Sequence, residues 1–299
     1  MYRWTRLSSQ KWEDAWDERL QFLGPGRVAM VTWPDSKALK IEVFTDKRTA
    51  GVLAKRFGGR VTKVASHIWT GKQSRPRAPL AIRGKLWIYS DEAAWKRSKK
   101  KTGSLWIPAG MAFGTGEHAT TATCLRLLCD VAEGLPTGWR AMDAGTGSGI
   151  LAVAAEKLGA SAVEAFDFDP VCVRIARENA RNNGCRRIMA TKADARKLAS
   201  FHRADVIVAN LFSDLLIAAA PGFARKLPPG GWLIFSGVLR KQAEEVCAKL
   251  VGLGFGPPRL VARGKWCAGA TRLTCESTMP KIIFQGFPSP VPSLIQNTP

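Results

Sequence analysis

The stretch Asp143-Ala144-Gly145-Thr146-Gly147-Ser148-Gly149 decides the fold class of this chain. It follows residues 140–144, which we expect to form a strand, and it leads into residues 150–158, which we expect to form a helix. Glycine at alternate positions lets the backbone turn tightly against a ligand. A dinucleotide site would place its third glycine at position 150, which is Ile150. Pyrophosphate binding is therefore disfavoured, and the pattern points to S-adenosylmethionine, held by Asp143, Gly145, Gly147 and Gly149.

A second acidic position lies beyond the next expected strand, residues 162–166. Asp167 comes 22 residues after Gly145, where a carboxylate can accept two hydrogen bonds from ribose hydroxyls. A plain turn residue at the strand end is the alternative for Asp167. Asp169 before Pro170 is better read as the N-cap of a helix. Asp194 ends the third strand region and is either a partner of the adenine amino group or a solvated loop acid.

Strands and helices alternate outward from this loop. We expect strands at 140–144, 162–166, 204–210 and 232–236, and helices at 150–158, 171–182, 214–226 and 241–253. Two late strands, 259–262 and 268–273, have no helix between them. This order predicts a doubly wound α/β sheet that ends in a hairpin.

The rest of the chain divides into three further segments. Residues 1–66 read as β-α-β-β-α-β, which predicts a small α+β domain of the ferredoxin-like kind. Its first helix carries Trp12, Trp16 and Leu20 at four-residue spacing. Residues 67–103 read as a basic connector with one short strand at 86–89, serving as a linker or as a segment that contacts nucleic acid. We expect the proline-rich tail 277–299 to be disordered, apart from an apolar patch at 281–284.

The charge is large and unevenly spread. The 299 residues include 45 Lys+Arg and 24 Asp+Glu, a net charge of +21, and 46% of residues are hydrophobic. This composition is typical of a globular protein of about two domains. Residues 1–106 hold 23 basic and 9 acidic residues, so two thirds of the excess lies in the first third. Attraction to a polyanion such as RNA or the ribosome is expected, with strong salt dependence.

Several classes of protein are disfavoured. Seven cysteines, an odd number without CxxC spacing, indicate core thiols in a reduced cytosolic protein and not a disulfide scaffold or a zinc site. No signal peptide and no membrane-spanning apolar run is visible, so we expect a cytoplasmic protein. The three histidines, His67, His118 and His202, show neither metal-ligand nor catalytic-triad spacing, so no metal is expected.

A longer motif adds a family resemblance. Met111-Ala112-Phe113-Gly114-Thr115-Gly116-Glu117-His118-Ala119-Thr120-Thr121 resembles the A-F-G-T-G-x-H-x-T-T signature of the ribosomal protein L11 methyltransferase (PrmA) family. Similar segments follow in order at 143–160, 166–184, 204–211 and Trp266-Cys267. The resemblance covers about 104–274, which we therefore take as a catalytic domain of residues 104–276.

The resemblance implies a fold, an activity and a set of site residues. It implies a seven-stranded, Rossmann-like class I methyltransferase that uses S-adenosylmethionine. The acceptors would be the N-terminal α-amine and lysine side chains of a large-subunit ribosomal protein, which the front domain would recognise. Cofactor contacts carry over to Thr121, Gly145, Asp167 and Asn210. The amide oxygen of Asn210 can accept from the acceptor amine and aim its lone pair. His118 and Glu117 are the candidate bases, and a structural role for His118 is the alternative.

Departures from the family pattern keep other functions open. Pro108-Ala109-Gly110 stands where the family has Asp-Pro-Gly, Ala119 replaces a proline, and Leu211-Phe212 replaces Ile-Leu. These positions touch the substrate more than the cofactor. An RNA methyltransferase, or a lysine methyltransferase for another protein, is the first alternative. A ribosome-assembly factor that binds the cofactor without catalysis is the second. The basic front third also leaves room for a weak contact with RNA.

Overall fold

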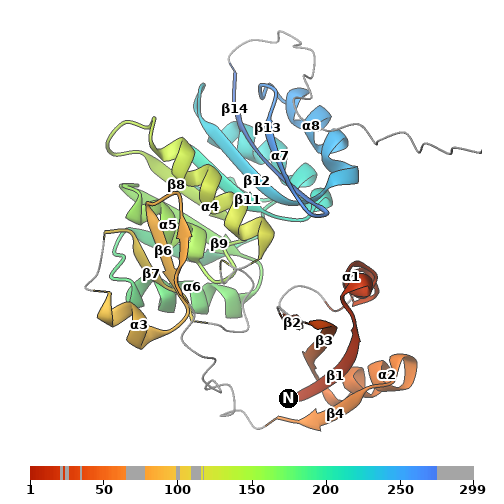
Figure 1. Ribbon diagram of the computed structural model, residues 1–299. Helices are drawn as coiled ribbons and strands as arrows, with labels where there is room; N and C mark the ends of the chain where they lie inside the picture. The colour runs from red at the N-terminus through yellow and green to blue at the C-terminus, as the bar shows by residue number, and fades with distance from the viewer. Residues whose placement is uncertain are drawn as a thin grey trace, which may run out of the picture.

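The front of the chain forms a four-stranded sheet with helices on one side (Figure 1). The computed structural model describes residues 1–20, 23, 27–33, 36–64, 78–98, 102–108, 116 and 118–274. The predicted tail and most of the segment 109–117 therefore lie outside the described residues. The sheet has the antiparallel order β2-β3-β1-β4. Its elements are β1 (Tyr2–Ser9), η1 (Gln10–Trp12), α1 (Glu13–Leu20), β2 (Val28–Trp33), β3 (Ser36–Thr45), α2 (Lys47–Phe57) and β4 (Arg60–Lys63).

Trp4 is the centre of the core of this front sheet. Its side chain is fully buried, and its indole Nε1 donates to the carbonyl of Gly58 at 2.7 Å. Its ring lies 6.2 Å from that of Trp16 and 6.4 Å from that of Phe57, so it joins both helices to the strands. The predicted stripe Trp12-Trp16-Leu20 is wrong at its first member, because Trp12 is 51% exposed. Trp12 lies in the 3₁₀ turn η1, whose three-residue period does not continue the spacing of the following α-helix.

The described part of the predicted connector is folded. It contains β5 (Leu80–Ile82), β6 (Leu86–Tyr89) and α3 (Glu92–Arg97), and the next strand, β7 (Ser104–Trp106) of the predicted catalytic domain, completes a small sheet in the order β5-β6-β7. Leu86 and Leu105 are fully buried in the same core as the helices of the large sheet. The side chain of Asn183 accepts from the backbone N–H of Trp106 at 2.7 Å and donates to its carbonyl at 2.8 Å. This pairing attaches β7 to the end of the helix that precedes Asn183.

The second half of the described chain is built on a seven-stranded sheet in the order β10-β9-β8-β11-β12-β14-β13. Five strands are parallel, and β14 runs antiparallel to both β12 and β13, which confirms the predicted final hairpin. The strands are β8 (Arg140–Ala144), β9 (Ala162–Asp167), β10 (Ile188–Lys192), β11 (Val206–Asn210), β12 (Trp232–Leu239), β13 (Arg259–Arg263) and β14 (Trp266–Arg272). The helices are α4 (Ala119–Ala132), α5 (Ile150–Lys157), α6 (Pro170–Asn182), α7 (Ser213–Lys226) and α8 (Ala243–Val251), with η3 (Arg240–Gln242) before α8.

Two apolar cores cover the two faces of this sheet. Successive residues of β8 belong to different cores: Ala141 packs with α4, α5 and α6, whereas Met142 packs with α7 and α8. This alternation follows from the two-residue period of a strand. The strand order changes direction between β8 and β11, so the carboxyl ends of these strands border a crevice in which ligands of such sheets bind.

Six of the seven cysteines lie in the described part of the chain. The six described cysteines are free thiols. No group of His, Cys, Asp or Glu in the described part of the chain has the arrangement of a metal site. Within the same residues, no helix has both the length and the apolarity needed to cross a membrane.

Replacement of Trp4 tests the core of the front sheet. We expect Trp4→Ala to lower the free energy of unfolding by about 3–5 kcal/mol, because a fully buried indole leaves a cavity. Trp12→Ala is the matched control, and we expect a change within about 0.5 kcal/mol because Trp12 is half exposed. Urea unfolding of the full chain, followed by tryptophan fluorescence, measures both. Equal losses in the two variants would contradict the assignment of the core.

Candidate active site

The loop from Gly145 to Gly149 turns the chain from β8 into α5 at the carboxyl edge of the sheet. Gly145, Gly147 and Gly149 have φ values of 73°, 54° and 81°, in the left-handed region that favours glycine. A Cβ on Gly145 would lie 2.5 Å from Cδ2 of Leu211. A Cβ on Gly149 would lie 2.9 Å from Cα of Ala176 in α6. Gly149 therefore allows two helices to pack closely, whereas Gly145 keeps the backbone close to the end of β11.

Asp143 is buried beneath this loop and is only partly satisfied. Its Oδ2 accepts from the Thr146 hydroxyl at 2.6 Å and from the backbone N–H of Ala152 at 3.0 Å. Its Oδ1 is buried and has no partner among the described residues. Burial raises the pKa of Asp143 to about 7, against the opposing effect of its two hydrogen bonds. A buried carboxylate oxygen without a donor is suited to an amino group of a ligand.

Asp167 lies beside the same loop at the end of β9. Its Oδ2 accepts from the backbone N–H of Gly147 at 3.0 Å, and its Oδ1 accepts from the backbone N–H of Asp169 at 3.0 Å. Each carboxylate oxygen has a second lone pair, so Asp167 can still accept from two ligand hydroxyls. Asp169 caps α6 through the backbone N–H of Val171 at 2.8 Å, which confirms the N-cap prediction.

Asp194 is near this edge, but its carboxylate is occupied. The backbone N–H of Ala193 donates to the carbonyl of Asp167 at 3.0 Å, so the chain before Asp194 follows the end of β9. Both oxygens of Asp194 accept from the Arg196 guanidinium, the shortest contact being 2.6 Å, and Oδ1 also accepts from the Arg196 backbone N–H. The hydrogen bonds from Arg196 lower the pKa of Asp194 to about 2. This geometry favours the loop-acid interpretation over a contact with adenine.

Asn210 joins the end of β11 to the start of α4. Its amide Nδ2 donates to the hydroxyl oxygens of Thr120 at 3.4 Å and Thr121 at 3.3 Å. With the amide in this orientation, Oδ1 is the atom left to accept from a ligand. Thr120 and Thr121 are 2% and 1% exposed, so the Asn210 side chain is positioned by buried groups. The fold thus brings Asn210 together with the end of the signature segment, about 90 residues earlier.

His118 belongs to the same hydrogen-bonded group. It is the N-cap of α4, where its Nδ1 lies 2.7 Å from the Thr120 hydroxyl and accepts from the Thr120 backbone N–H at 3.4 Å. The edge of its ring also packs against Trp266, with the centroids 5.6 Å apart. These contacts give His118 a structural position at the helix start, through which it orients Thr120 and hence Asn210. Glu117, the other candidate base, lies outside the described residues.

Two residues at this edge were not predicted from the sequence. Gly237 sits at an irregularity of β12 with a φ of 84°, and a Cβ there would lie 2.5 Å from the carbonyl oxygen of Leu211. The sequence does show a glycine within this apolar strand, and such a glycine often marks a bulge or a close approach of another backbone segment. Phe168, next to Asp167, is 71% exposed, which is unusual for a large apolar side chain.

The raised pKa of Asp143 predicts a pH-dependent stability. The native chain keeps a proton on Asp143 up to about pH 7, whereas the unfolded chain releases it near the ordinary value of 3.8. Because the unfolded state then binds fewer protons, this residue makes stability fall as the pH rises from about 4 to about 7. We expect Asp143→Asn to flatten the decline, as measured by urea unfolding across this range. Parallel curves for the two proteins would contradict the buried, protonated carboxyl.

Comparison with known proteins identifies relatives over most of the chain. Residues 6–273 match the model of the family described as ribosomal protein L11 methyltransferase (PrmA). The chain is 36% identical over 232 residues to the ribosomal protein L11 methyltransferase of Pelotomaculum thermopropionicum, covering 75% of this chain and 73% of the relative. It is 34% identical over 241 residues to that of Dechloromonas aromatica, covering 78% of each.

A solved structure agrees with this match. The crystal structure of a ribosomal protein L11 methylase from Lactobacillus delbrueckii subsp. bulgaricus superposes with a TM-score of 0.59 at 30% identity, covering 66% of this chain and all of that one. The family model spans both the front sheet and the large sheet, and the signature, the glycine loop and the Asn210 segment occur in the predicted order. The chain therefore belongs to the ribosomal protein L11 methyltransferase (PrmA) family.

Proposed function

We propose that this protein transfers methyl groups from S-adenosylmethionine to amino groups of ribosomal protein L11, at its N-terminal α-amine and its lysine side chains. The observation that carries the proposal is the position of Asn210. Its amide is held by Thr120 and Thr121 at the carboxyl edge of the sheet, and the next residue, Leu211, lies against the glycine loop. A cofactor cradle and a hydrogen-bond acceptor for an amine are thus adjacent. Membership of the family supports the same substrate.

The residues at this edge fit S-adenosylmethionine. The unpartnered Oδ1 of Asp143 suits its amino group, and the absence of a side chain at Gly145 leaves room for its approach. Asp167 is placed to accept from the ribose hydroxyls, and the exposed ring of Phe168 offers a flat apolar surface to the adenine. We also assign Thr121, Gly147 and Gly149 to this site. Gly149 acts indirectly, because it supports the conformation of the loop. When bound, the cofactor supplies a methyl group already activated on a sulfonium.

The acceptor amine needs orientation and the loss of a proton. The Oδ1 of Asn210 accepts from an amine N–H and directs the nitrogen lone pair, which is a gain in proximity and orientation. A lysine side chain has a pKa of about 10.4 in water and must become neutral. An apolar, closed site lowers that pKa by disfavouring the charged form. His118 acts in our proposal as a positioning residue, because its Nδ1 is already engaged with Thr120.

The remaining parts of the proposal concern the domains. The sheet order β2-β3-β1-β4 supports a ferredoxin-like front domain that recognises the ribosomal protein, and the large sheet supports a class I methyltransferase domain. The predicted limits 1–66, 67–103, 104–276 and 277–299 remain part of the proposal. The burial of Ile82 and Leu86 in the core of the large sheet favours an earlier start for the catalytic domain. A ribosomal protein substrate is consistent with the expected cytoplasmic location.

Transfer of labelled methyl groups tests the proposed reaction. We expect the full chain, given labelled S-adenosylmethionine and purified ribosomal proteins and RNA, to label ribosomal protein L11 and to place the label on amino nitrogens in mass spectra. Asn210→Ala should lower turnover about 100-fold, because misplacing a reacting group by about 1 Å has that effect. Asn210→Asp keeps an acceptor oxygen and should retain more activity than the alanine variant.

Other outcomes of that experiment would select the alternatives. Label that is released by ribonuclease and absent from protein would make the enzyme an RNA methyltransferase. Label on the lysines of a different ribosomal protein would keep the chemistry and change the substrate. The absence of turnover together with intact cofactor binding would favour a ribosome-assembly factor.

The roles of Asp167 and Asp194 in cofactor binding are separable by affinity. Asp167→Asn should weaken binding of S-adenosylhomocysteine about 10- to 100-fold, since a hydrogen bond to a charged group contributes about 1.5–3 kcal/mol. Asp194→Asn is the control, with an expected change of about twofold or less, because its carboxylate is already occupied by Arg196. Isothermal titration calorimetry measures both, and a larger loss at Asp194 would reverse the assignment.

A further inference from the structure

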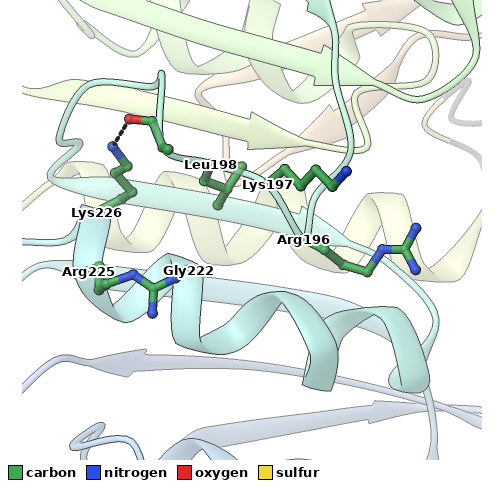
Figure 2. Close-up of a pocket in the computed structure, with 7 residues that line it drawn as sticks. Arg196, Lys197, Leu198, Gly222, Arg225 and Lys226 are labelled. Carbon is green, nitrogen blue, oxygen red and sulfur yellow. Dashed lines mark hydrogen bonds between the residues drawn. The ribbon is translucent and has the colours of Figure 1, made fainter.

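A basic hollow lies on the catalytic domain between α7 and the segment that follows β10. It has a volume of about 480 Å³. Figure 2 shows Arg196 and Lys197 extending from the segment on one side, with Arg225 and Lys226 on the last turn of α7 on the other. Leu198, Ala199 and Gly222 form the surface between them. The hollow therefore combines an apolar floor with a rim of positive charge.

The hollow depends on a glycine within the helix. A Cβ on Gly222 would lie 3.2 Å from Cδ1 of Leu198, a close contact that any larger side chain would worsen. Glycine in a helix interior costs about 1 kcal/mol relative to alanine. The side chain of Leu198 is 4% exposed, so it packs into the space that Gly222 leaves. The floor is thus a fixed part of the fold.

Two of the four cations already have structural partners. Arg196 holds Asp194, as described above. The ammonium of Lys226 donates to the carbonyl of Ala199 at 2.9 Å and to that of Phe201, which fixes the segment against the end of α7. These two residues shape the hollow, and their charge still contributes to the local field.

The charged groups of Lys197 and Arg225 are exposed, and within the described part of the chain they form no hydrogen bond or ion pair. Residues 194–204 and 222–226 together carry five Lys and Arg side chains against the single carboxylate of Asp194. Such an excess around one concave surface attracts polyanions and raises their local concentration.

This hollow is separate from the proposed active site. It lies at the C-terminal end of α7, whereas Asn210 precedes the N-terminal end of that helix. The 14 residues of α7 correspond to a length of about 21 Å at about 1.5 Å per residue. The α7 end of the hollow is therefore distant from Asn210, whereas Arg196 on the opposite rim binds Asp194.

We propose that the hollow binds the sugar-phosphate backbone of RNA, with Lys197 and Arg225 contacting two phosphates and the surface of Ala199 and Gly222 receiving the sugar or base between them. Two unpaired cations on opposite sides of an apolar floor match a polymer in which phosphates alternate with apolar groups. A free phosphate ion would gain nothing from the floor. An acidic peptide would contact the cations through carboxylates and is the competitor that the test must separate.

Anisotropy of a fluorescein-labelled single-stranded oligouridylate, titrated with the full chain over a range of salt, tests the proposal. The double variant Lys197→Ala/Arg225→Ala removes two phosphate contacts. We expect the slope of log K against log salt to fall by about 1.4 and binding at 0.1 M salt to weaken about 25-fold. Arg181→Ala/Lys249→Ala is the matched control, because it removes the same charge from exposed residues in the last turns of α6 and α8. It should retain affinity within about twofold, since exposed substitutions away from a binding site have small effects.

Two further measurements locate the contact and identify the ligand. Photo-crosslinking with 4-thiouridine in the oligonucleotide should attach it to peptides from 196–203 or 222–226 in the wild-type chain and not in the double variant. Equal loss of affinity in the two double variants would show a response to net charge alone and overturn the proposal. Displacement of RNA by polyglutamate, or by inorganic phosphate at constant ionic strength, as effectively as by unlabelled RNA would also overturn it.

Discussion

The close approach of three backbone segments at one edge of the sheet is the constraint on which the rest of the site depends. A Cβ on Gly145 would lie 2.5 Å from Cδ2 of Leu211, and a Cβ on Gly237 would lie 2.5 Å from the carbonyl oxygen of Leu211. The backbone N–H groups of Gly145 and Thr146 both donate to the carbonyl of Phe166 at 2.9 Å, which ties the loop to β9 as well. A Cβ on Gly237 would collide with the backbone carbonyl of Leu211, and Gly145 has the left-handed φ that favours glycine, so the loop after β8, the end of β11 and the irregularity of β12 lie together beside Asn210.

The polar groups at this edge extend that constraint to α4. Asn210 donates to Thr120 and Thr121, and His118 caps the same helix and bonds to Thr120. Asp143 is buried, and its Oδ1 has no hydrogen-bond partner among the described residues. Above pH 7 its ionised carboxylate lowers the free energy of unfolding, and a residue with a purely structural role would not require this loss. Costly polar groups gathered at the crevice of a doubly wound sheet are typical of a functional site. The basic hollow at the far end of α7 is built differently, from exposed cations and an apolar floor.

The points where the structure adds to the sequence-based predictions have both local and distant causes. The spacing of Trp12, Trp16 and Leu20 is helical, but the chain enters α1 through a 3₁₀ turn, and Trp12 is exposed. Residues 67–103 read as a connector because the strands there are only three or four residues long, but Ile82 and Leu86 are buried in the core of the large sheet. For Asp194 the sequence left two interpretations open, an adenine partner and a loop acid, and the engagement of both of its oxygens by Arg196 favours the loop acid.

Local patterns in the chain were enough to establish the α/β class, the strand–loop–helix at Gly145, the acidic end of β9 and the family. These features depend on periodicity, on turn-forming residues and on motifs, all of which are properties of neighbouring residues. The unpaired oxygen of Asp143, the shared hydrogen bonds of Asn210 with α4, the role of Gly237 and the hollow beside Gly222 required the folded chain. Each of these features depends on groups separated by 20 residues or more in the sequence, or on the burial of a polar group away from water. The order of neighbouring residues determines neither the distance between such groups nor their exposure to solvent.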